Sequence, residues 1–88
     1  MALKAILLRK EIESNKAKLT ALREKTTEFE TREAEIEAAI DEAETEEEKT
    51  AISEEVDKFE AEKEAHDKEV SELENTIAQQ ERELEEIE

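Results

Sequence analysis

Residues 36–56 read IEAAIDEAETEEEKTAISEEV, and this stretch decides how the chain folds. On either side of it, apolar residues recur at alternating steps of three and four, a spacing of about 3.5 residues that is typical of coiled-coil helices. Continuing the first ladder of apolar residues would place Glu47 and Glu54 on the apolar stripe. The residues that are apolar beyond the midpoint are instead Ile52 and Val56. The sequence therefore predicts that the seam restarts near residue 46.

Each ladder predicts one half of a helix–helix seam. Its apolar members are Leu8, Ile12, Leu19, Leu22, Phe29, Ile36 and Ile40 in the first half, and Ile52, Val56, Phe59, Val70, Leu73, Ile77 and Leu84 in the second. Six polar residues occupy seam positions between them: Asn15, Thr26, Glu33, Lys63, His66 and Gln80.

The polar seam residues favour an antiparallel arrangement. If the chain folds back near residue 46, they meet as three pairs across the seam: Thr26 with His66, Glu33 with Lys63 on a diagonal, and Asn15 with Gln80 on a diagonal. In a parallel, in-register dimer each residue would face its own copy, so that two Glu33 carboxylates would be desolvated together at a high cost. An antiparallel dimer of straight helices would give the same pairings as a hairpin, and this alternative stays open.

A helix-start signal lies at the midpoint. Thr45 and Glu48 form the Thr-x-x-Glu pattern of a capping box, in which the two side chains satisfy amide hydrogens of an opening helix. We therefore expect an all-α fold, a long antiparallel two-helix hairpin or coiled coil with helices over about 2–43 and 46–87 and a turn near 44–48. One unbroken helix whose seam shifts at a phase slip remains the alternative.

Composition and charge exclude several protein classes. Of the 88 residues 48% are charged and 2% are aromatic, and the chain has no Gly, Pro or Cys, which is typical of long helices. Residues 1–44 have a net charge of -3 and residues 45–88 a net charge of -13, although the first 32 residues are at +3. A chain at -16 repels phosphate backbones, so we expect no nucleic-acid binding.

The apolar runs are short. The longest, Ala5 to Leu8, is far below the roughly 20 residues that a membrane span requires, and basic residues flank it too closely for a signal peptide. We expect no membrane partner and a soluble chain that is not exported.

The chain lacks the residue patterns of an active site, and we expect no enzymatic activity and no cofactor. His66 is the only histidine, and with Glu62 and Glu69 one turn away on either side it could contribute to a metal site. We interpret His66 instead as a half-buried seam residue bonded to Thr26, and expect no metal. Neither a cysteine nucleophile nor a Gly-rich loop for phosphate is present in the sequence.

The first two turns carry apolar residues outside the seam. Leu3, Ile6 and Leu7 point away from the stripe that Ala5 and Leu8 define. Exposed apolar groups of this kind normally need a partner. They predict a docking patch for another copy or another protein, and local packing at the helix end is the alternative.

Three stretches read MALKAILLRK (residues 1–10), REAEIEAAIDEAETEEEK (32–49) and VDKFEAEKEAH (56–66). They resemble the amino-terminal delta domain of tailed-phage major capsid proteins of the Hong Kong ninety-seven type. The resemblance implies a helical segment ahead of a shell-forming domain, so that residues 1–88 would be one coiled-coil domain of a longer chain. It further implies a built-in scaffold inside the procapsid, in the host cytoplasm, which contacts its own copies and capsid subunits and is later removed by a maturation protease.

Two other functions stay open. A generic structural coiled-coil stalk or spacer would have the same heptads, but it would favour a long parallel or straight coil. An acidic DNA-mimic inhibitor would need carboxylates at phosphate-like spacing on one rigid face, whereas Lys and Arg are interspersed with acids throughout the first half. We therefore expect a non-enzymatic assembly scaffold that promotes procapsid assembly through helix–helix contacts.

Overall fold

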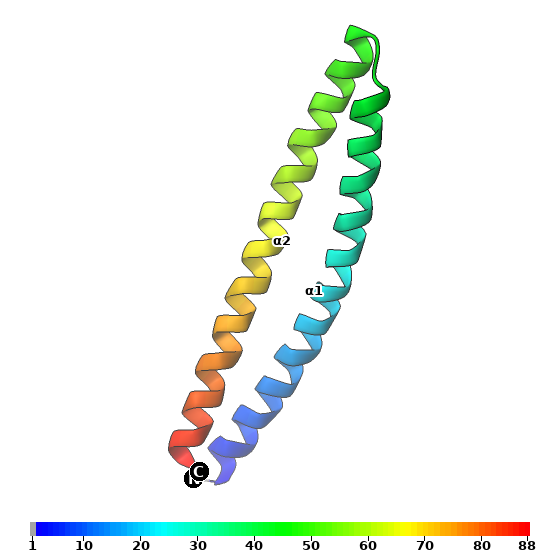
Figure 1. The fold of residues 1–88 in the computed structure, drawn as a ribbon. Coiled ribbons are helices and arrows are strands. Elements are labelled where there is room, and N and C mark those ends of the chain that lie inside the picture. The colour runs from blue at the N-terminus through cyan, green and yellow to red at the C-terminus, as the bar shows by residue number, and fades with distance from the viewer. Residues whose placement is uncertain (1) are drawn as a thin grey trace.

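The protein is a hairpin of two long helices (Figure 1). A computed structural model describes residues 2–88 and places α1 at Ala2–Glu42 and α2 at Glu46–Ile87. The helices run antiparallel, with both ends of the chain at one end of the molecule and the turn at the other. The molecule measures 67 × 16 × 13 Å, whereas one straight helix of 88 residues would be about 130 Å long. The predicted all-α antiparallel hairpin is confirmed.

The turn is shorter than the sequence indicated. Residues 43–45 connect the helices, instead of the stretch predicted near 44–48. The amide of Ala43 donates to the carbonyl oxygen of Ala39 at 3.0 Å, which closes the last turn of α1. With no Gly or Pro in the chain, the helix boundary is made by hydrogen bonding at Thr45 and not by a helix breaker.

Thr45 caps α2. Its backbone is extended, with φ -94° and ψ 157°, and its hydroxyl oxygen accepts a hydrogen bond from the Glu48 amide at 3.1 Å. The Glu48 carboxylate accepts in turn from the Thr45 hydroxyl at 3.1 Å, a different bond from the amide contact that a capping box predicts. Glu46, Glu47 and Glu48 form an acidic first turn, which the helix dipole favours.

The core is a single thin seam. Its most buried apolar side chains retain 6–7% of their exposure: Ala5, Leu8, Ile12, Leu19 and Ile36 on α1, and Phe59 and Ile77 on α2. The other seam residues are partly buried, with the exception of Ile40: Leu22, Phe29, Ile52, Val56, Val70, Leu73 and Leu84. The exposed area is 6870 Å², compared with about 5300 Å² for a compact protein of this mass. The hairpin therefore offers an unusually large surface for its size.

Ile40 corrects the predicted seam, because it is 51% exposed. Near the turn, the partly buried face of α1 includes Arg32, Ala39 and Ala43, in addition to the buried Ile36. These four positions are spaced by four, three and four residues and share one helix face. Since that face meets α2, the neighbouring Ile40 turns outward.

Candidate functional site

His66 lies at the centre of the seam and is more deeply buried than expected, at 6% exposure. Its Nε2 atom is 3.1 Å from the Thr26 hydroxyl, and its ring centroid is 4.8 Å from that of Phe29. Thr26 itself is exposed, so the hydrogen bond lies at the edge of the seam and not in its middle. The ring thus has one polar partner and one aromatic partner on α1.

Arg32 forms a cross-helix cluster that the sequence interpretation missed. Its Cζ atom lies 5.5 Å from the centroid of the Phe29 ring and 5.3 Å from that of Phe59, and the two rings are 6.0 Å apart. The guanidinium donates from Nη1 to Glu62 Oε2 at 2.7 Å. A cation over aromatic faces is attracted by their negative charge density. The signal was available in the spacing of Phe29 and Arg32, which share a helix face.

Glu33 and Lys63 do not form the predicted pair. Glu33 is exposed, and the Lys63 ammonium bonds instead to Asp67 Oδ2, one turn along α2, at 2.9 Å. The hydrogen bond and the charge of Asp67 raise the pKa of Lys63, with smaller contributions from the charges of Glu33 and Glu30. The Glu33 carboxylate stays exposed because burying it in the seam would remove its hydration without supplying a partner in contact.

Asn15 and Gln80 are brought together, as are Thr26 and His66. Asn15 Nδ2 donates to Gln80 Oε1 at 3.0 Å, and Gln80 Nε2 donates to Glu11 Oε2 at 3.3 Å. These hydrogen bonds satisfy polar atoms that would otherwise lack a partner in the seam. Among the described residues, no buried side-chain nitrogen or oxygen lacks a hydrogen-bond partner.

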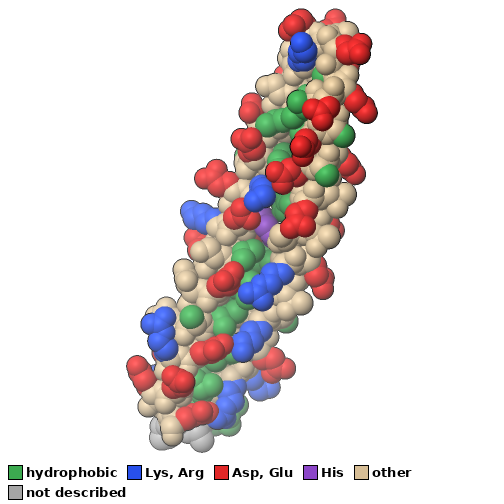
Figure 2. All heavy atoms as spheres, in the orientation of Figure 1, with side chains coloured by type: hydrophobic (Ala, Val, Ile, Leu, Met, Phe, Trp, Pro, Cys, Tyr) green, Lys and Arg blue, Asp and Glu red, His purple; other side chains and the backbone are tan. Residues whose placement is uncertain are grey.

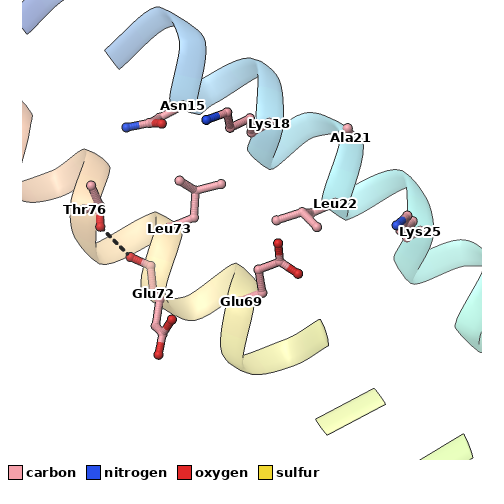
Figure 3. A pocket seen from close by; sticks show the side chains of 9 residues that line it. All are labelled: Asn15, Lys18, Ala21, Leu22, Lys25, Glu69, Glu72, Leu73 and Thr76. Atoms are coloured by element: carbon pink, nitrogen blue, oxygen red, sulfur yellow. Dashed lines mark hydrogen bonds between the residues drawn. The ribbon is translucent and has the colours of Figure 1, made fainter. Parts of the chain in front are cut away.

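A groove between the helices runs past Leu22 and Leu73, which point toward each other across it (Figure 3). Its flanks carry Lys18 and Lys25 on α1 and Glu69 on α2. In residues 2–88 no group of three or more His, Cys, Asp or Glu side chains is arranged to hold a metal ion. Glu62, considered above as a metal ligand with His66, is bonded to Arg32.

The end with the chain termini exposes an apolar cluster. Leu3 is 77% exposed, Ile6 46% and Leu7 57%, while Ala5 and Leu8 are buried against α2. We call Leu3, Ile6 and Leu7 the start patch. These are the three residues for which the sequence predicted a docking role, and their side chains are exposed to solvent.

The turn end exposes a second apolar feature, which sequence reasoning did not find because it placed Ile40 in the seam. A shallow groove there is lined by Ile40, Ala43, Lys49, Ile52, Ser53 and Val56. We call these six residues the turn groove.

Charges are distributed unevenly between the two ends. On the face shown in Figure 2, acidic side chains predominate at the turn end, and most Lys and Arg side chains lie in the half that holds the termini. Arg9 forms an ion pair with Glu88, and Lys16 Nζ lies 3.2 Å from Glu81 Oε1. The basic start of α1 therefore lies beside the acidic end of α2. All four side chains are about half exposed, so these pairs add little stability.

No family model, curated protein or solved structure matches this chain. Neither α1 nor α2 contains an apolar stretch long enough to cross a membrane. The class that the fold defines is a charged, antiparallel coiled-coil hairpin with an apolar feature exposed at each end.

Proposed function

We propose that this chain is a non-enzymatic assembly scaffold of the delta-domain type, joined to a phage major capsid protein and acting through contacts between helices. In this proposal copies of the hairpin lie inside the procapsid, in the host cytoplasm. They hold capsid subunits together while the shell forms, and a maturation protease then removes them.

The observation that carries the proposal is the start patch at one end of the hairpin. Three large apolar side chains are 46–77% exposed at one end of a molecule 67 Å long, next to seam residues that are buried. Fully burying a Leu or Ile side chain is worth roughly 1.5–3 kcal/mol, so a patch of this size supports weak, reversible contacts. Reversibility suits a scaffold, because misplaced subunits must be able to leave.

The charge of the chain supports removal before DNA enters. Each copy has a net charge of -16, so many copies inside a shell would repel the phosphate backbone. Proteolytic removal would free both volume and charge for packaging. A parallel stalk, the second function considered from the sequence, does not fit the antiparallel hairpin.

The test compares the capsid polypeptide with and without residues 1–88, expressed in the same host. We expect the complete polypeptide to form closed shells, and the truncated one to form fewer or misshapen particles in electron micrographs. The control keeps residues 1–88 and replaces Ala34, an exposed residue outside both the start patch and the turn groove, with Gln. Normal shells from the truncated polypeptide would show that the hairpin is not a scaffold.

A further inference from the structure

We infer that the start patch of one copy docks in the turn groove of a second copy, so that hairpins join end to end. The inference deepens the proposed function by naming the surface that receives the patch, and it rests on the self-association proposed there. Its occupant is a second copy of this chain.

Two unpartnered apolar surfaces lie at opposite ends of the same rod. Ile6 and Leu7 follow Leu3 by three and four residues, so the three side chains form one ridge on α1. The turn groove presents a concave apolar surface in which Ile40 is 51% exposed. Side-chain ridges on one helix pack into grooves on a neighbouring surface, and the start patch and the turn groove supply one of each.

The charges favour patch against groove over the two symmetric contacts, patch against patch and groove against groove. Residues 1–10 carry three basic and no acidic side chains, and Lys10 shares the helix face of Ile6 and Leu7. Residues 41–49 carry six acidic side chains and one lysine. Patch against patch would bring Lys10 near its own copy, and groove against groove would bring twelve carboxylates together, which is costly. Patch against groove brings the basic residues of 1–10 near the six acidic residues of 41–49, which outnumber Lys49, the one charged residue among the six of the turn groove.

The geometry also predicts the form of the assembly. A contact between two different surfaces leaves one free patch and one free groove on every growing chain, so association continues unless a ring closes. The small apolar area of each surface makes each contact weak. A scaffold with these properties would extend across neighbouring capsid subunits.

The experiment uses the 88-residue chain and two end-blocked variants. The first replaces Leu3, Ile6 and Leu7 with Gln, and the second carries Ile40→Gln. All four positions are exposed, so the seam is retained, and circular dichroism verifies the helix content of each variant. Ala34→Gln, at an exposed position of α1, is the matched control.

Sedimentation velocity over a range of concentrations gives the association constant. We expect the parent and Ala34→Gln to associate progressively. Each end-blocked variant alone should lose at least about tenfold in association constant, which corresponds to about 1.4 kcal/mol. An equimolar mixture of the two variants should form pairs of one copy each and nothing larger, because each variant supplies the surface that the other lacks.

Three outcomes would overturn the inference: Ile40→Gln alone associating like the parent, the mixture forming no pairs, or the parent remaining monomeric at every concentration. The proposed function is judged separately, by shell formation with and without residues 1–88. If shells form only with residues 1–88 present but the mixture of variants forms no pairs, the scaffold function is retained and this contact is rejected.

Discussion

Phe29 lies between two polar side chains, His66 of α2 and Arg32 one turn further along α1. The His66 ring centroid is 4.8 Å from that of Phe29, and Arg32 Cζ is 5.5 Å from it. An aromatic ring can cover a cationic group and still interact favourably with it, because the face of the ring attracts positive charge. Five of the six polar seam residues therefore have specific partners, and the sixth, Glu33, is exposed to solvent.

Arg32 should contribute measurably to stability. We expect Arg32→Ala to lower the free energy of unfolding by about 1 kcal/mol, since it removes a partly exposed ion pair and contacts with two aromatic rings. Urea unfolding followed by circular dichroism gives the value. Arg23→Ala is the control, because Arg23 is an arginine of the same helix whose side chain is exposed. Equal unfolding free energies for the two variants would reject the role assigned to the cluster.

Lys63 should make stability depend on alkaline pH. The hydrogen bond to Asp67 raises its pKa above 10.5, so folding favours the protonated form. The contribution is therefore fully present below the unfolded pKa and is lost as pH rises through the folded pKa. We expect Lys63→Gln to be less stable than the parent near neutral pH and equally stable well above pH 10.5. Lys68→Gln serves as the control, and a difference from the parent that is the same at both pH values would contradict the assignment.

The two helices and their pairing can be predicted from the sequence. Apolar heptads predict two helices, and the positions of the polar seam residues predict their antiparallel pairing, because both depend only on residue type and spacing. The face that α1 presents near the turn was not predictable in this way. It depends on Arg32 packing over two rings from different helices and on a connection of only three residues, 43–45. The exposed Ile40, and with it the turn groove, follows from that tertiary packing.

Thr45 should set the start of α2. We expect Thr45→Ala to lower the free energy of unfolding by about 1 kcal/mol, because the Glu48 amide loses its side-chain acceptor. Thr45→Ser keeps the hydroxyl and should retain most of the stability. Thermal unfolding compares both with Thr50→Ala, a substitution at an exposed position further along α2. If Thr45→Ala melts like Thr50→Ala, the cap does not stabilise the turn.

As a whole, the molecule is a rod with different ends. One end carries the start patch beside basic residues, and the other carries the turn groove among acidic ones (Figure 2). The start patch lies on α1 alone, whereas the turn groove is built from residues of α1 and α2 together. The end-to-end contact therefore depends on a hairpin closed within one chain.

The distance between Lys25 and Glu69 tests that closure directly. Both residues are exposed and flank the groove of Figure 3 from opposite helices, and the chain has no cysteine of its own. Spin labels on Lys25→Cys and Glu69→Cys, in chains diluted with excess unlabelled protein, should lie within about 20 Å, given axes of packed helices about 10 Å apart. A distance near 66 Å, roughly the length of 44 helical residues, would show one straight helix and contradict the hairpin.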